Sequence, residues 1–234
     1  MTDPLTLVIA NKNYSSWSLR PWLVMTELGI EFSERMVKFD SDDWEQNIAQ
    51  LSPSRLVPVL WEGEPGSGFA TFDTIAILER LHEIRPEAKV WPSDPQKRSR
   101  ARSLVANFHS GYLSLRAAMP MNIRSRYPGK GMSPEVAGEI ERLCELWVST
   151  RHEFADGGEF LFGEFCAADA FFAPVASRFV TYEVNLEGEA KQYQHVLLNT
   201  DAMKAWTVEA LNETEFVQMD EPYAIAGGNS SSTG

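Results

Sequence analysis

The strongest constraint on the fold is the order of patterns before residue 85. An apolar run typical of a strand, residues 5–10, is followed by a helical pattern that ends at Gly29. Residues 32–38 read as a second strand, and a helical crossover between two strands returns the chain in the same direction. The first two strands are therefore expected to be parallel.

The following segment predicts a short helix, a β-hairpin and a third helix. Residues 44–51 have a helical pattern that the Ser41-Asp42 pair can cap. Two short apolar runs, 57–61 and 69–72, flank an acidic turn that contains glycine, which is typical of a hairpin. With a helix from 73 to about 85, the order is βαβαββα, which predicts a mixed sheet with helices on its faces.

The rest of the chain is helical in character. Residues 86–94 contain several turn residues and no period, so we expect them to link a first domain, 4–85, to a second. An all-helical second domain is predicted over 95–223, with a flexible tail at 224–234. Its helices are expected from 95 until Pro120, from 134 until Asp156, and at about 167–182, 190–198 and 201–212.

The net charge and the numbers of cysteines and histidines disfavour several classes of partner and site. The formal net charge is −12, and such an acidic surface disfavours nucleic acid and anionic membranes as main partners. Cys144 and Cys166 are the only cysteines, which excludes a disulfide framework and a four-cysteine zinc site. The N-terminus has no signal-peptide pattern and no run reaches membrane-spanning length, so a cytoplasmic location is expected. The four histidines show no spacing that suggests a metal site.

The polar stretch between the first strand and the first helix, residues 13–22, is the candidate site. Ser15, Ser16 and Ser18 place hydroxyl groups beside the unpaired N–H groups and the positive end of a helix dipole. An anion is readily held at such a position. The alternative is that these serines only cap the helix, because serine is a favoured N-cap residue.

Four motifs, in this order along the chain, resemble those of the glutathione S-transferases. Residues 14–20 resemble the active-site segment of the serine-type zeta, tau and theta-like classes. Val57-Pro58 resembles the family's Val-Pro before the third strand, and 72–78 resembles the acidic and hydroxyl pair that heads the third helix. Residues 163–170 resemble a helix-capping motif of the second domain. The resemblance implies a thioredoxin-like α/β domain followed by an all-α domain, over residues 4 to about 220.

The resemblance implies an enzyme that uses glutathione as co-substrate, without a metal. A serine hydroxyl would donate to the glutathione sulfur, and the helix dipole would favour its thiolate. The thiolate would attack, or promote isomerisation of, a small electrophile. Ser15 is the first candidate for the hydroxyl, Ser16 a close second and Tyr14 a third. The alternative is a non-catalytic binding or scaffold protein that keeps the fold.

The resemblance also implies which residues bind glutathione. The acidic and hydroxyl pair would hold the γ-glutamyl group, the Val-Pro peptide would pair with the cysteinyl moiety, and a cation would bind the glycyl carboxylate. In chain order these residues are Lys38, Arg55, Val57, Pro58, Asp73 and Thr74.

A pocket for a small, apolar electrophile is expected between the two domains. Aromatic and methionine side chains suit such a substrate. A homodimer is also expected from the family, with the third helix and the helix after Asp94 at its interface. The candidate pocket residues are Trp17, Phe108, Tyr112, Arg116, Met119 and Met121.

Two residues depart from the family pattern. Cys166 stands where the capping motif normally has serine or threonine, and a thiol is a poorer acceptor. Asp73 stands where glutamate or glutamine is usual, which shortens the reach toward the ammonium group of glutathione. The first departure affects folding, and the second affects ligand binding.

Overall fold

The computed structural model describes residues 3–224, so most of the predicted tail at 224–234 lies outside the described residues. The N-terminal part contains β1 (Leu5–Ile9), α1 (Ser16–Glu27), β2 (Ser33–Met36), α2 (Asp42–Leu51), β3 (Val59–Glu62), β4 (Phe69–Phe72) and α3 (Thr74–Ile84). A 3₁₀ turn, η1 (Pro86–Ala88), lies in the link. The C-terminal part contains α4 (Pro95–Ser110), α5 (Leu113–Ala118), α6 (Pro134–Phe154), α7 (Ala167–Thr181), α8 (Gly188–Leu198), α9 (Asp201–Asn212) and the 3₁₀ turn η2 (Gln218–Asp220).

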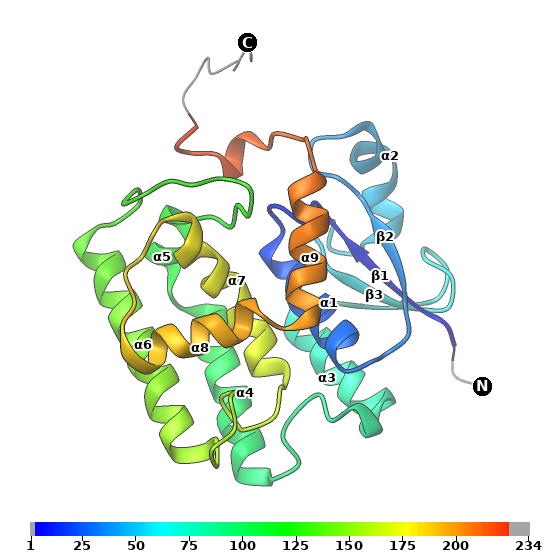
Figure 1. Ribbon diagram of the computed structural model, residues 1–234. Coiled ribbons are helices and arrows are strands. Elements are labelled where there is room, and N and C mark those ends of the chain that lie inside the picture. The colour runs from blue at the N-terminus through cyan, green and yellow to red at the C-terminus, as the bar shows by residue number, and fades with distance from the viewer. Residues whose placement is uncertain (1–2, 225–234) are drawn as a thin grey trace.

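The four strands form one mixed sheet in the order β2-β1-β3-β4. β1 is parallel to β2, as the helical crossover requires, and β3 is antiparallel to both β1 and β4. Leu7 of β1 lies opposite Glu34 on one side and Leu60 on the other. The thioredoxin-like βαβαββα arrangement predicted from the sequence is confirmed (Figure 1).

The alternation of side chains along β1 places helices on both faces of the sheet. Leu7 and Ile9 belong to the large core cluster, which also contains Leu19 of α1 and Leu81 of α3. Val8 belongs to a second cluster on the opposite face, where Trp44 and Leu51 of α2 pack. Successive side chains of a strand point to opposite faces, so α1 and α3 cover one face and α2 the other.

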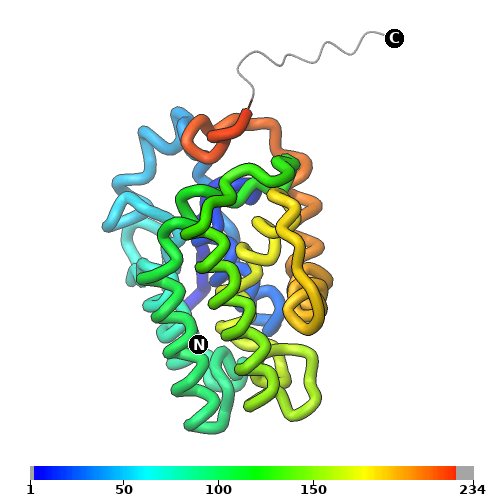
Figure 2. The backbone as a smooth tube through the Cα atoms, turned by 90° about the vertical axis from the view of Figure 1, so that its left-hand side faces the viewer, coloured from blue at the N-terminus to red at the C-terminus, as the bar shows by residue number. Residues whose placement is uncertain are grey.

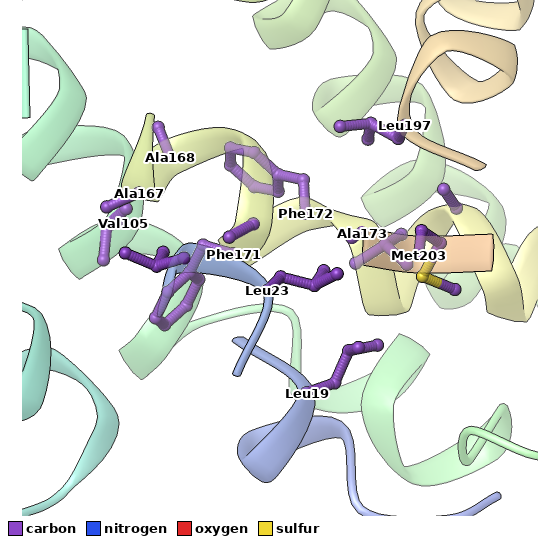
Figure 3. Packing of buried hydrophobic residues seen from close by; sticks show 14 of the residues in the cluster. Leu19, Leu23, Val105, Ala167, Ala168, Phe171, Phe172, Ala173, Leu197 and Met203 are labelled. Atoms are coloured by element: carbon purple, nitrogen blue, oxygen red, sulfur yellow. The ribbon is translucent and has the colours of Figure 1, made fainter. Parts of the chain in front are cut away.

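The core is continuous between the sheet part and the helical part. Figure 3 shows Leu19 and Leu23 of α1 close to Phe171 and Ala173 of α7, in one buried cluster. Figure 2 shows the helical part from the side, with the long helices α4 and α6 along its length. Since α1 packs directly on α7, side chains from the two parts can meet at the start of α1.

One predicted helix is divided in the structure. A single helix was expected from 95 until Pro120, but α4 ends at Ser110 and Tyr112 takes a left-handed conformation with φ 55°. α5 then begins at Leu113. Arg116 stabilises the break, because its Nη1 donates to the carbonyls of His109 and Gly111 at 3.0 and 3.3 Å. The apolar period continues through α5, so the sequence pattern gives no sign of the interruption.

The segment after α9 runs from the end of that helix toward the loop between α5 and α6 (Figure 1), and it contacts the loop after β1. The carboxylate of Glu213 accepts the N–H groups of Lys12 and Asn13 at 2.6 and 3.1 Å. This contact joins the loop after β1 to the end of α9. The segment that follows, including η2, is thereby brought to the start of α1. Within residues 3–224, none of the helices is long and apolar enough to cross a membrane.

Candidate functional site

A turn and a pair of serines fix the start of α1. The carbonyl of Asn11 accepts the N–H groups of Tyr14 and Ser15 at 3.2 and 2.8 Å. Ser15 is the N-cap; its Oγ accepts the N–H of Ser18 at 3.4 Å and donates to Ser18 Oγ at 2.7 Å. Ser18 Oγ also accepts the N–H of Ala10 at 3.2 Å, so the helix start is tied to the end of β1. Helix capping therefore occupies both Ser15 and Ser18.

A cavity of about 470 Å³ lies beside this helix start. Its walls come from α1, α2 and the loop before it, the loop before β3, α5, α7 and the segment after α9. Ser15 and Ser16 place hydroxyl groups in one wall, next to the positive end of the α1 dipole. The lining residues are Tyr14, Ser15, Ser16, Trp17, Phe39, Trp44, Leu56, Val57, Leu113, Arg116, Ala117, Pro120, Met121, Arg178 and Asp220.

A second cavity, of about 510 Å³, is lined from the loop before β3 and the starts of α1 and α3. It brings together Val57, Pro58, Asp73 and Thr74, which the resemblance stated above assigns to one ligand. It shares Trp17, Leu56, Val57 and Arg116 with the first cavity, so the two spaces meet at one wall. Its lining residues are Trp17, Ser54, Leu56, Val57, Pro58, Phe72, Asp73, Thr74, His109 and Arg116.

Val57 offers free backbone groups to both cavities. The peptide bond between Val57 and Pro58 is cis. In the described part of the chain, the N–H and C=O of Val57 make no hydrogen bond. A free donor and acceptor on adjacent backbone can pair with a peptide lying alongside. This geometry suits a ligand that carries amide groups.

The start of α3 offers one carboxylate oxygen to the second cavity. Asp73 is the N-cap of α3, and its Oδ1 accepts the N–H of Ile75 at 2.9 Å. Its Oδ2 lies 3.6 Å from Nε2 of His109, a contact that the sequence did not predict. Thr74 is almost fully buried, and its hydroxyl donates to the carbonyl of Trp17 at 3.3 Å. The hydroxyl group of Thr74 is therefore positioned by α1.

Three arginines surround the start of α1 and make it locally positive in an acidic protein. Arg20 is buried; its Nε donates to the Phe171 carbonyl and its Nη1 to the Ser16 carbonyl, both at 3.0 Å. Burial, together with the nearby charges of Arg178 and Arg116, holds the pKa of Arg20 well below its usual range. The centre of the Trp17 ring lies 4.2 Å from the guanidinium carbon of Arg20 and 4.9 Å from that of Arg116. An anion at this site would relieve the repulsion among them.

Arg178 of α7 is a functional candidate that the sequence analysis missed. Its side chain is buried and lines the first cavity. Its Nε donates to the Met119 carbonyl at 2.7 Å, and its Nη2 donates to Ser16 Oγ at 3.1 Å. Burial lowers its pKa to about 10, so the guanidinium remains charged at neutral pH. A charged residue inside an otherwise apolar helix is the one sequence signal that could have identified it.

Asp220 is the acidic counterpart in the same cavity. It belongs to η2, in the segment that returns from α9. Burial raises the pKa of Asp220 to about 6, and the charge of Arg178 opposes that rise. At neutral pH the carboxylate is therefore ionised in the wall that also holds Arg178.

Tyr14 is turned toward the C-terminal segment. Its hydroxyl donates to Glu221 Oε1 at 2.7 Å and accepts from Nη2 of Arg124 at 2.8 Å. Burial, followed by the hydrogen bond to Glu221, raises the pKa of Tyr14 to about 12. Its hydroxyl is therefore committed to contacts within the protein.

The other predicted residues line the first cavity, lie in or against the core, or lie outside both cavities and the core. Trp17, Arg116 and Met121 line the first cavity. Phe108 and Met119 are fully buried in the core cluster, and Tyr112 stacks on Phe108 with ring centroids 5.1 Å apart, so none of the three is among the lining residues. Lys38 pairs with Glu215 of the C-terminal segment. Arg55 makes no side-chain hydrogen bond or ion pair with the described residues and takes a left-handed backbone conformation with φ 57°.

The described residues contain no group of three or more histidine, cysteine, aspartate or glutamate side chains placed to hold a metal ion. The donors at the site are hydroxyl, guanidinium and peptide groups, which bind anions and amides. The chemistry available here is stabilisation of an anion at the start of a helix, next to a pocket with aromatic and sulfur-containing walls.

The N-terminal part of the chain matches a known family model, and a longer stretch matches a curated protein. Residues 14–84 match the model of the glutathione S-transferase N-terminal domain. Among curated proteins, the chain is 24% identical to maleylacetoacetate isomerase of Rattus norvegicus over 158 residues, which are 65% of this chain and 70% of that protein.

Solved structures share the whole fold at low sequence identity. A glutathione transferase homologue from Burkholderia, solved with bound glutathione, is 21% identical, with a TM-score of 0.65; the alignment covers 90% of this chain and 99% of that one. A diazinon-metabolizing glutathione S-transferase of the silkworm Bombyx mori is 15% identical, with a TM-score of 0.69 and coverage of 89% and 97%. At these identities the likeness establishes the fold.

Proposed function

We propose that the chain is a glutathione transferase, a proposal supported by the match of residues 14–84 to the glutathione S-transferase N-terminal domain and by the shared fold. It binds glutathione in the cavity at Val57 and Asp73 and holds the thiolate at the start of α1. The thiolate then attacks a small electrophile, or promotes its isomerisation, in the cavity beside Ser15 and Ser16.

The observation that carries this proposal is the shared wall of the two cavities. The two cavities share the wall formed by Trp17, Leu56, Val57 and Arg116, and Ser15, Ser16 and Arg178 line the first cavity next to that wall. A free thiol has a pKa near 8.5 and is mostly protonated at neutral pH. Each unit by which the site lowers that value corresponds to about 1.4 kcal/mol of preference for the thiolate. Hydroxyl donors, the helix dipole and nearby cations all act in that direction.

The glutathione backbone fits the groups of the second cavity. The free N–H and C=O of Val57 pair with the cysteinyl amide groups, with Pro58 holding the turn. The γ-glutamyl ammonium binds Asp73, and its carboxylate binds at the N-terminus of α3 beside Thr74. The ammonium group would bind Oδ2 of Asp73, because Oδ1 accepts the N–H of Ile75 in the helix cap.

The glycyl carboxylate has two candidate cations. Arg55 makes no ion pair with the described residues and can turn toward a ligand without breaking one. Lys38 would first have to leave Glu215. Arg55 is therefore the stronger candidate, and Lys38 remains the second.

The second substrate is proposed to be a small electrophile with an apolar part. Trp17 and Met121 give the first cavity its apolar walls, and Arg116 lies at its junction with the second. The curated relative is a maleylacetoacetate isomerase, so isomerisation is a reaction to test beside conjugation. We also propose a homodimer formed through α3 and α4, where Phe72, next to α3, is exposed.

The test is retention on immobilised glutathione followed by a thiol-conjugation assay with a panel of small electrophiles. The parent protein is expected to bind and to conjugate, and Asp73→Asn to bind less well. A parent protein that binds glutathione without turnover would support the alternative, a binding or scaffold protein with this fold. A folded protein that does neither would overturn the proposal.

A further inference from the structure

We propose that Ser16, rather than Ser15, donates the hydrogen bond to the glutathione thiolate, and that Arg178 is the positioning residue that directs the Ser16 hydroxyl. This inference rests on the proposed function. It chooses between Ser15 and Ser16, which the sequence leaves as alternatives. It also gives a role to Arg178, the buried arginine of α7.

The hydrogen bonds of Ser15 are all used within the protein. Its Oγ accepts the N–H of Ser18 at 3.4 Å, which is the cap of α1. Its O–H donates to Ser18 Oγ at 2.7 Å. A hydroxyl group has one proton to give, so Ser15 can donate to sulfur only by breaking its bond to Ser18. That bond also supports the Ala10 contact to the same oxygen.

Unlike Ser15, Ser16 has a hydroxyl proton that is free to donate. Its Oγ accepts from Nη2 of Arg178 at 3.1 Å. A guanidinium group has only donors, so the proton of the Ser16 hydroxyl has to point elsewhere. Among the described residues this proton has no acceptor, and Ser16 lines the cavity. An anionic sulfur at the start of α1 is the acceptor that fits, because serine, arginine and helix dipole all favour negative charge there.

Arg178 is held firmly enough to set this direction. Its side chain is only 5% exposed, and its Nε donates to the Met119 carbonyl at 2.7 Å. Its Nη1 is buried and has no partner in the described structure, so the guanidinium carries a positive charge that the protein does not neutralise by a direct contact. The charges near it are those of Arg116 and Arg20 and, with opposite sign, that of Asp220. A thiolate held by Ser16 would place a second negative charge, after that of Asp220, near Arg178.

The proposed step is an ionisation. The S–H bond of glutathione breaks, the electron pair stays on sulfur, and the proton leaves to solvent. Ser16 keeps its own proton and shares it with the sulfur. No side chain needs to accept a proton, so the role of Ser16 can be measured directly as the pKa of the bound thiol.

The experiment is ultraviolet titration of the thiolate in the glutathione complex. Ser16→Val is compared with Ser16→Thr, which has a similar shape and keeps a hydroxyl. A hydrogen bond to a charged group corresponds to about 1 to 2 pKa units, so Ser16→Val should raise the pKa of the thiol by that amount and Ser16→Thr by much less. Ser15→Ala should mainly lower the melting temperature, with a smaller change in the pKa of the thiol. A larger rise in Ser15→Ala than in Ser16→Val would overturn the assignment.

A double-mutant cycle tests whether Arg178 acts on the thiol through Ser16. Arg178→Lys keeps a positive charge but loses the two-pronged contact with Ser16 and Met119. It should raise the pKa of the thiol in the parent, and the same substitution should have a clearly smaller effect in Ser16→Val. Equal effects in both backgrounds would show that Arg178 acts on sulfur without Ser16. Arg178→Gln serves as the second variant if the lysine variant does not fold.

The outcomes separate this inference from the proposed function. If the parent binds glutathione and lowers the pKa of its thiol, the function holds whichever serine is responsible. If both serine variants keep the parent's value, the assignment of Ser16 is wrong and the function is unaffected. If the parent binds glutathione but leaves its thiol pKa unchanged, both proposals for catalysis fail.

Discussion

The hydroxyl of Tyr14 donates to Glu221 over 2.7 Å, and so joins the loop before α1 to the far end of the described chain. Tyr127 also donates to Glu221, from the loop between α5 and α6. Glu221 is buried, with 5% exposure, so its carboxylate depends on these donors. The contact holds the C-terminal segment, and with it Asp220, against the cavity.

Tyr14→Phe is expected to lower stability without changing the ionisation of bound thiol. Removing a hydrogen bond to a buried carboxylate costs about 1 to 3 kcal/mol. The measurements are chemical denaturation and titration of the glutathione complex.

The matched control for this substitution is Tyr223→Phe. Its hydroxyl donates to a main-chain carbonyl, that of Ala118, at 2.7 Å. The loss of stability should be smaller than in Tyr14→Phe because no buried carboxylate is left without a donor. A change in the pKa of the thiol in Tyr14→Phe would instead assign the tyrosine a direct role at sulfur.

Asp73→Asn is expected to weaken glutathione binding. The substitution keeps the oxygen that caps α3 but removes the charge proposed to bind the ammonium group. The loss of a charge-assisted hydrogen bond corresponds to about a 10- to 100-fold rise in the dissociation constant. Isothermal titration calorimetry measures it, and an S-methyl analogue of glutathione should be affected equally, since the thiol is not involved. An unchanged dissociation constant would remove Asp73 from the ammonium site.

The sheet part was predictable because its signals are local. The strand and helix patterns, the cap at Asp73 and the hairpin all depend on residues close together in the sequence. The break after Ser110 was not predictable, since it depends on a left-handed Tyr112 and on Arg116 reaching back to the end of α4. Neither feature interrupts the apolar period.

The same reasoning explains what the sequence missed at the site. Ser15 and Ser16 could be proposed from the sequence because a strand-to-helix junction is visible locally, and both line the first cavity. Arg178 contacts Ser16 across a separation of 162 residues, and that contact exists only because α7 packs on α1. Phe108 and Met119 recur at helical spacing, which is the same for a residue that lines a pocket and for one that packs in the core. In the structure both lie in the core. Periodicity identifies a buried face but not what it is buried against.

Cys166→Ser is expected to stabilise the protein. Cys166 is the N-cap of α7, and its N–H is already held by Asp169 Oδ2 at 3.0 Å. The Cys166 side chain accepts the N–H of Asp169 in a capping box, and a serine hydroxyl is a better acceptor for that N–H than a thiol. The expected gain is about 0.5 to 1 kcal/mol in the free energy of unfolding. Cys144→Ser, inside α6, is the control and should give no gain, because no free N–H groups lie there.

Asp220→Asn is expected to raise stability at neutral pH and to lower the pKa of the bound thiol. Burial raises the pKa of Asp220 to about 6 in the folded protein, above the value of 3.8 that it takes when exposed. The folded state therefore binds this proton more tightly than the unfolded state, so the contribution of Asp220 is most favourable below pH 4 and declines as the pH rises to 6. Asparagine cannot ionise, so Asp220→Asn does not lose stability at this position as the pH rises.

The difference in melting temperature between Asp220→Asn and the parent should therefore grow from pH 4 to pH 6 and stay level above it. Asp220 lines the cavity that holds Ser16, so removal of its negative charge should also favour a thiolate there. Glu215→Gln is a suitable control, because Glu215 lies in the same segment and pairs with Lys38 outside the cavity. If the melting temperatures of Asp220→Asn and the parent ran parallel between pH 4 and pH 6, the carboxylate would titrate like an exposed one. The negative charge that it places opposite Arg178 would then be screened by solvent.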